Sequence, residues 1–160
     1  MRRSVPVLAC ILLLLGPAIL PALSRADLDR VIDFSVTLKS LATAAERGAP
    51  IPAGKTVLLS GTVSDVNIIN KDQAGFKVRI ELITGEWIGT EDVKAYSCYV
   101  EFTGAEYFKV FPARPPRTAS RDLVSMNSRV IVLGRVVDVA TTPLGAKRVL
   151  LDGAYIRSIE

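Results

Sequence analysis

The chain has 160 residues and a formal net charge of +4, and 49% of its residues are apolar and 22% charged. This length allows one globular domain with a short appendage, and the high apolar fraction excludes a largely disordered chain. Because the sequence contains no histidine, a Ser-His-Asp triad, a histidine general base and histidine zinc ligands are excluded as well.

The first 26 residues have the anatomy of a signal peptide. Arg2 and Arg3 form a positively charged start, and an apolar run follows over Val5–Leu15. Ser24 and Ala26 place small residues at the two positions that a signal peptidase reads. We therefore expect cleavage after Ala26 and an exported protein, either periplasmic or secreted.

A retained N-terminal anchor is the alternative, because the 19 residues of Val5–Leu23 are just long enough to span a bilayer. Contact with a membrane is expected only in that case. Cleavage removes three arginines and no acid, which leaves 17 basic against 16 acidic residues and lowers the net charge to +1. The basic balance of the full chain therefore belongs mostly to the leader and does not indicate nucleic-acid binding.

The cysteines indicate a core without disulfides. Cys10 leaves with the leader, so Cys98 is the only thiol of the mature chain and no internal disulfide can form. A free cysteine is most often a small buried apolar residue, and we expect this of Cys98. An exposed thiol that forms an intermolecular disulfide is the alternative.

Residues 27–48 are predicted to form one N-terminal helix, because apolar residues recur there at helical spacing. Asp27 can cap the start of this helix, and Gly48 can end it in a left-handed turn. The following residues, 49–55, contain two prolines and form a linker to the main domain.

From Thr56 onward the pattern is that of β-strands, with β-branched runs and alternation of apolar and polar residues. Five strands are predicted, at residues 57–69, 76–82, 95–102, 129–139 and 147–159. The stretch Thr84–Asp92 is predicted to be a long loop. Residues 104–127 interrupt the strands, with one short helical piece at Ala105–Phe111 and a second at Leu123–Met126.

One short motif, G-x-V-x-D-V, occurs at residues 61–66 and again at residues 134–139. A glycine inside a strand indicates a bulge or a sharp bend, so the first and fourth strands are expected to bend in the same way. Three strands, a helical interruption and two further strands are the order of an OB fold. We therefore predict a mainly β protein, with a five-stranded OB-fold Greek-key barrel over residues 56–160.

Three segments of this barrel resemble the bacterial OB-fold family called tRNA-anti-like. They are residues 57–63, 123–136 and 149–156. That family commonly has Gly-Asp before the fourth strand and a cysteine in the fifth, where this chain has Asn127-Ser128 and Ala154. The resemblance implies kinship with anticodon-binding modules.

The first candidate site is the outer face of the second and third strands, where OB folds generally bind ligands. This rule selects Lys77, Arg79, Ser97 and Tyr99, with Trp87 in the adjoining loop. Lys71 and Lys147 are expected near the two flanking loops. A basic strand beside an aromatic ring can stack a base or a sugar and hold a phosphate.

A purely structural role for these residues is the favoured alternative. Lys77 and Arg79 can pair with Glu81 and Glu101 across the sheet, since this face carries equal numbers of acids and bases. Trp87 is then a loop residue that packs on the rim of the barrel.

The second candidate is a basic patch with aromatic neighbours. It comprises Lys109, Arg114, Arg117 and Arg121, followed by Arg129 and Arg135, with Tyr107, Phe108 and Phe111 beside it. Such a patch can contact phosphates or lipid headgroups. A solvated connection whose arginines point in different directions is the favoured alternative.

No motif for catalysis stands out. Asp65, Asp138 and Asp152 fit polar turn positions as well as they fit a metal site, and we expect no catalytic residue, no metal and no cofactor. The sequence therefore predicts an exported, non-enzymatic binding module of the cell envelope, with a protein or a glycan as ligand. Nucleic-acid binding is the alternative.

Overall fold

The computed structural model describes residues 24–112 and 122–159. The predicted leader up to residue 23 lies outside the described residues, as do Arg114, Arg117 and Arg121 of the predicted basic patch. In chain order the elements are α1 (Arg25–Val31), β1 (Ile32–Asp33), α2 (Leu38–Arg47), β2 (Thr56–Asn70), β3 (Lys77–Ile88), β4 (Asp92–Thr103), the 3-10 helix η1 (Ala105–Lys109), β5 (Arg129–Thr141) and β6 (Lys147–Ser158).

The strands form a single six-stranded sheet in the order β1-β2-β3-β4-β6-β5. Because β2 also pairs with β5, hydrogen bonding runs around a closed ring of β2, β3, β4, β6 and β5. All five predicted strands are present, in a mainly β structure. The predicted number of strands is one too small, because the sequence analysis found no sign of β1. This strand has only two residues, which pair with the start of β2 and are too few to show a periodic pattern in the sequence.

Alternate residues of neighbouring strands fill the inside of the ring. In β3 and β4 the inward-facing residues form fully buried cross-strand pairs: Val78 with Phe102, Ile80 with Val100, and Leu82 with Cys98. The residues between them point outward, as the two-residue period of a strand requires. The same alternation therefore builds the core and sets out the side chains of the outer face.

The two glycines of the repeated motif lie where the strands change partner or register. β2 pairs with β5 up to Thr62 and with β3 from there onward. A Cβ atom on Gly61 would lie 2.6 Å from the carbonyl oxygen of Ile83, so only glycine allows this close approach. In β5 the register shifts between Leu133 and Gly134. The predicted irregularity is confirmed at Gly134, whereas in β2 the nearest register shift lies between Val63 and Asp65, two residues after Gly61.

The single helix predicted over residues 27–48 is wrong, because the structure divides this segment into α1, β1 and α2. The Asp33 carboxylate accepts hydrogen bonds from the backbone N–H and the hydroxyl of Ser35, at 3.1 and 2.6 Å. Thr37 then caps α2 by accepting from the N–H of Ser40 at 3.1 Å. Short polar side chains thus satisfy the backbone locally and interrupt the helix that the apolar spacing predicts.

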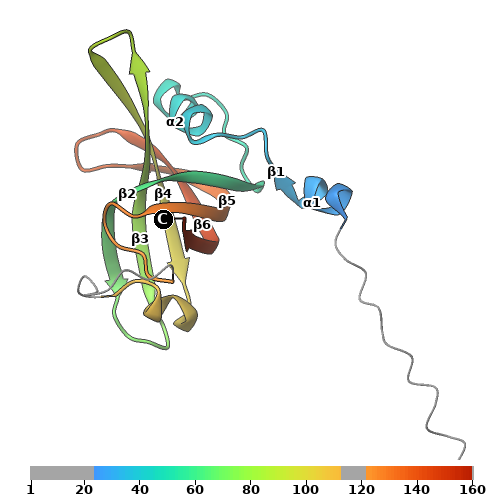
Figure 1. The fold of residues 1–160 in the computed structure, drawn as a ribbon, viewed down its shortest axis with the longest axis vertical. Coiled ribbons are helices and arrows are strands. Elements are labelled where there is room, and N and C mark those ends of the chain that lie inside the picture. The colour runs from blue at the N-terminus through green and yellow to red at the C-terminus, as the bar shows by residue number, and fades with distance from the viewer. Residues whose placement is uncertain (1–23, 113–121, 160) are drawn as a thin grey trace, which may run out of the picture.

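The two ends of the ring are covered differently (Figure 1). α2 lies at one end and buries four side chains in the core, namely Leu38, Leu41, Ala42 and Ala45. It ends at Gly48, whose φ of 65° is the left-handed turn that the sequence predicts. η1 lies at the opposite end, where Tyr107 and Phe111 are buried.

The structure confirms the first predicted helical piece after β4, because η1 occupies it. The second piece, expected at Leu123–Met126, is absent, and turns connect to β5 instead. Val124 is buried there, and its N–H donates to the carbonyl of Val110 at 2.8 Å. Val124 is therefore apolar because it packs in the core from a turn, and not because it belongs to a helix.

The long loop predicted between the second and third strands is also wrong. β3 and β4 continue as a paired ribbon, with Trp87 opposite Val93, while the pairing of β3 with β2 ends at Ile83. Residues 84–96, called the hairpin arm below, therefore extend past the ring (Figure 1). At the base of the arm, Thr84 and Gly85 interrupt the alternation of apolar and polar residues. The backbone pairing of β3 with β4 does not require this alternation and continues through both residues.

Candidate binding surfaces

The outer face of β3 and β4 brings together only part of the first predicted site. Arg79 lies directly opposite Glu101 and stacks on the ring of Tyr99, with 5.5 Å between the guanidinium carbon and the ring centre. Lys77 lies beside them through the same glutamate. Ser97 is buried, with 6% of its surface exposed, and is not available to a ligand.

Glu101 neutralises both predicted cations of this face. Lys77 Nζ lies 2.7 Å from one carboxylate oxygen, and Arg79 Nε donates to the other at 2.9 Å. Partial burial raises the pKa of Glu101, but the hydrogen bonds and charges of Lys77 and Arg79 outweigh it, so that the pKa lies below its ordinary value. The cross-strand pairing favoured from the sequence is thus present for Glu101.

Glu81 has different partners from those expected. Its carboxylate accepts a hydrogen bond from the Ser64 hydroxyl at 3.0 Å and lies 3.7 Å from Nε of Arg148 on β6. Asp152, also on β6, pairs with Arg135 at 3.3 Å. The acids and bases described on this side of the ring therefore compensate one another, and these residues form no concentration of positive charge.

Trp87 differs from both sequence interpretations. It lies in β3 rather than in a loop, and 71% of its surface is exposed, so it does not pack on the rim. Eight residues separate Trp87 from Arg79 along the strand, which corresponds to about 26 Å. The five residues predicted as one site therefore do not form a single site.

One face of the hairpin arm is braced against α2. Glu86 pairs with Lys39 of α2 at 2.6 Å and accepts a hydrogen bond from the hydroxyl of Tyr96 at 2.9 Å. The hydrogen bond from Lys39, followed by that from Tyr96, lowers the pKa of Glu86. Lys94 reaches Glu46 of α2 at 3.5 Å. These contacts fix the position of the arm relative to the ring.

The opposite face of the arm is apolar and open. Trp87 and Val93 lie across from one another and are 71% and 53% exposed. Between this pair and Tyr99 the outer face carries small residues, including Gly85 and Ala95. The outer face thus changes from charged and internally paired on the ring to apolar and uncovered on the arm.

The second predicted site converges only in small part among the described residues. Lys109 ends η1, whereas Arg129 begins β5 and Arg135 lies farther along that strand, next to Asp152. Lys109 instead lines a hollow of about 400 Å³ together with Lys71 and three phenylalanines. This hollow was not predicted from the sequence, although the aromatic residues around Lys109 were a signal for it.

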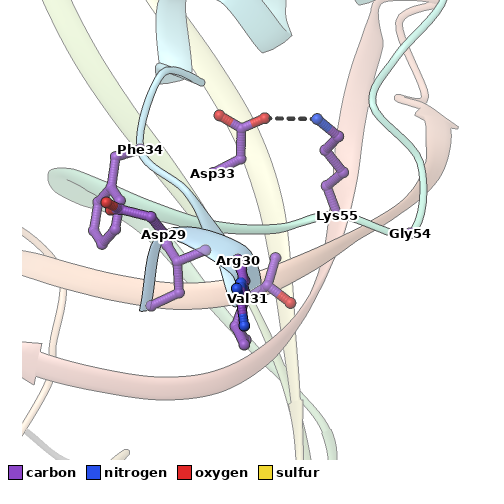
Figure 2. Close-up of a pocket in the computed structure, with 9 residues that line it drawn as sticks. Asp29, Arg30, Val31, Asp33, Phe34, Gly54 and Lys55 are labelled. Carbon is purple, nitrogen blue, oxygen red and sulfur yellow. Dashed lines mark hydrogen bonds and ion pairs between the residues drawn. The ribbon is translucent and has the colours of Figure 1, made fainter. Parts of the chain in front are cut away.

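A larger hollow of about 550 Å³ lies where α1 and β1 meet the start of β2 (Figure 2). Lys55 Nζ lies 2.9 Å from the carboxylate of Asp33, and Figure 2 shows this pair within the lining. Hydrogen bonds from Ser35, and then from Lys55, lower the pKa of Asp33 to about 2. This ion pair attaches β1 to the ring, together with the parallel pairing of Ile32 and Asp33 with the first two residues of β2.

Cys98 is buried as predicted, and burial raises the pKa of its thiol to about 12. Within residues 24–112 and 122–159, no group of three potential ligands is arranged to hold a metal ion. In the same part of the chain, no helix has the length and apolar character needed to cross a membrane.

No protein-family model and no curated protein matches the chain. Its fold is similar to part of a protein described as an aspartyl-tRNA synthetase from Leishmania major, with 14% identity, a TM-score of 0.48, and coverage of 90% of this chain but 23% of that one. It is also similar to a small single-stranded DNA-binding protein from Streptomyces coelicolor, with 11% identity, a TM-score of 0.40, and coverage of 64% and 90%.

A third similar structure is that of the Plasmodium falciparum SSB with single-stranded DNA, with 14% identity, a TM-score of 0.38, and coverage of 66% of this chain and 94% of that one. SSB proteins are built on OB folds, and the closed ring described above agrees with an OB-like arrangement. At these identities and TM-scores the similarities carry no information about the ligand of this chain.

Proposed function

We propose that this protein is an exported, non-enzymatic binding module on a five-stranded OB barrel, and that it binds a segment of another envelope protein on the open face of its hairpin arm. The observation that carries this proposal is the exposed pair of Trp87 and Val93 on an arm fixed from behind by α2. Export rests on the signal-peptide anatomy of residues 1–26.

The chemistry of the arm favours a protein over a glycan. A sugar stacked on Trp87 needs polar groups beside the ring to bond its hydroxyls, whereas the neighbouring positions are Val93, Gly85 and Ala95. Exposed tryptophan surrounded by apolar residues is typical of the energetic centres of protein interfaces. An apolar side chain of the partner is therefore the group that this face receives.

The backbone of the arm supports the same conclusion. Beyond Ile83, β3 pairs with β4 alone among the described strands, so its other edge is available to an added strand. Adding a strand to a sheet edge is a common way of binding an extended peptide. The brace between Glu86 and Lys39 holds this edge in place before binding, which lowers the ordering cost.

Nucleic-acid binding is the second candidate, and Arg79 on the ring of Tyr99 favours it. An arginine beside an aromatic ring is a common element of sites for single strands. Against it stands Glu101, which pairs with both Lys77 and Arg79 and removes the free positive charge that phosphate binding needs.

Crosslinking in intact cells separates the two candidates. The chain is crosslinked in the cells that export it, and the captured protein is quantified for wild type and for Trp87→Ala. The proposal predicts that Trp87→Ala lowers capture at least about tenfold, because interface tryptophans contribute about 2 kcal/mol or more. Val137→Ala, which shortens another exposed apolar side chain, is the matched control and leaves capture unchanged.

Equal capture by wild type and Trp87→Ala contradicts the proposed arm site. Tight, steeply salt-dependent binding of single-stranded DNA by the purified chain, lost in Arg79→Gln, establishes the second candidate instead.

A further inference from the structure

The hollow beside η1 lies at the end of the ring opposite α2 and the hairpin arm. It has a volume of about 400 Å³, within the range of sites for small organic ligands. Its apolar walls come from Ile68 at the end of β2, Phe76 before β3, and Phe108 and Phe111 in and after η1.

These walls are held in place by the core. Phe76 and Phe111 are each only 2% exposed and belong to the buried cluster of the ring. Phe108 is 40% exposed and meets Phe76 edge to face, with 5.6 Å between the ring centres. The hollow is therefore preformed, and one of its aromatic rings is open to an incoming group.

Two cations line the same hollow, Lys71 from the loop between β2 and β3 and Lys109 from the end of η1. Among the described residues, neither lysine forms an ion pair, although most other lysines of the ring and its helices do. An apolar hollow with two uncompensated positive charges is complementary to a molecule with an apolar body and an anionic group.

We propose that this hollow binds a small alkyl carboxylate, with the chain against the phenylalanines and the carboxylate on Lys71 and Lys109. The other lining side chains carry no hydrogen-bonding group, so a nucleobase would lose the hydrogen bonds of its polar edges. An alkyl chain has no such groups to satisfy. The site is independent of the proposed function, because it lies away from the hairpin arm and uses none of its residues.

Calorimetric titration of the full chain with decanoate, below its micelle concentration, tests the proposal. A single saturable site is expected, and each methylene added between octanoate and decanoate should strengthen binding about three- to fourfold. Uncharged decanol should bind about tenfold more weakly than decanoate, because it lacks charge-assisted hydrogen bonds to the two lysines.

Variants locate the site. Lys71→Gln with Lys109→Gln should weaken decanoate about tenfold and leave decanol unchanged. Lys147→Gln, at the start of β6 and outside the lining of the hollow, is the matched control and should change the affinity for neither decanoate nor decanol. Because both lysines of the site are exposed, these substitutions leave the core intact, and an unchanged unfolding transition verifies this.

Three results would overturn the proposal: equal binding of decanol and decanoate, decanoate binding that is unaffected by the double variant, or tighter binding of a nucleoside monophosphate than of decanoate. Binding to anionic vesicles without binding of monomeric decanoate would also overturn it, because the positive charge would then serve a lipid surface rather than a small-molecule site.

Discussion

At the scale of single residues, close approaches of the backbone decide whether the ring can form. Gly153 of β6 lies under the ring of Phe102, and a Cβ atom there would come within 2.3 Å of a ring carbon. Phe102 is fully buried and also contacts the rings of Tyr107 and Phe111. The ring carbon therefore has no free space to move into, and a single added methyl group must displace packed aromatic side chains.

Replacing Gly153 with alanine should lower the free energy of unfolding by about 2 kcal/mol, the usual cost of overpacking a dense core. Urea denaturation measures this change. Gly75→Ala is the matched control, because its nearest neighbour is the end of the half-buried Asn70 side chain at 3.1 Å rather than a packed aromatic ring. Equal stability of the two variants would show that the aromatic cluster around Phe102 is loosely packed.

The thiol of Cys98 should be inert in the folded protein. Burial raises its pKa to about 12, so the reactive thiolate is essentially absent at neutral pH. We expect no labelling of Cys98 by iodoacetamide in the native chain and full labelling in urea, as mapped by mass spectrometry. Rapid labelling of the native protein would contradict the burial of this side chain.

Sequence patterns predicted the elements that depend on side-chain burial and missed those that depend on local polar contacts. Alternation placed the paired core of β3 and β4 correctly, because burial selects apolar residues at every second position. It ended β3 too early, since pairing in the arm does not require a buried face. It also joined α1 to α2, because the hydrogen bonds of Asp33 and the cap at Thr37 leave the apolar spacing unchanged.

The same reasoning explains the candidate sites. The pairing of Lys77 and Arg79 with an acid was foreseeable, because cross-strand neighbours follow from alternation once the register is fixed. The position of the hollow was not, because Lys71 and Lys109 are far apart in the sequence and are brought to one end of the ring only by the antiparallel pairing of β3 with β4.

At the scale of elements, the position of the hairpin arm depends on α2. Glu86→Gln removes the charge that pairs with Lys39, so amide hydrogen exchange of residues 84–96 should become faster while exchange in the ring stays unchanged. Glu91→Gln, in the turn of the same arm, is the matched control and should have no effect. Unchanged exchange in Glu86→Gln would mean that backbone pairing alone holds the arm.

Acid should loosen the same brace. The folded state lowers the pKa of Glu86 below its ordinary value of 4.5, so the stabilisation is present above that value and is lost as the pH falls through the lower, folded pKa. We expect the fluorescence of Trp87 to change in this acidic range in wild type and not in Glu86→Gln. A change of the same size near neutral pH would contradict this assignment.

At the scale of the whole molecule, the ring separates two surfaces of different chemistry. The arm beside α2 exposes an apolar face, and the far end holds an apolar hollow with two lysines. Between them the acids and bases of the outer face are paired. Within residues 24–112 and 122–159, this distribution leaves no continuous positive track.

Single-stranded DNA should consequently bind weakly and with a shallow dependence on salt. A site that neutralises several phosphates gives a slope near −0.7 per phosphate contacted in a plot of log affinity against log salt. With Lys77 and Arg79 paired to Glu101, we expect a slope of about −1 or smaller in magnitude. Fluorescence anisotropy with a labelled oligonucleotide measures it, and a slope several times steeper would contradict the charge pairing.

The most direct test of the proposed protein ligand is a photocrosslinking residue introduced at Val93 and, separately, at Thr103, which is exposed at the other end of the same strand. In cells that export the chain, we predict that illumination joins the Val93 variant to one discrete partner protein and that Trp87→Ala abolishes this product. The Thr103 variant should give none. Equal crosslinking from both positions, or a product that persists in Trp87→Ala, would contradict the assignment of the hairpin arm as the binding surface.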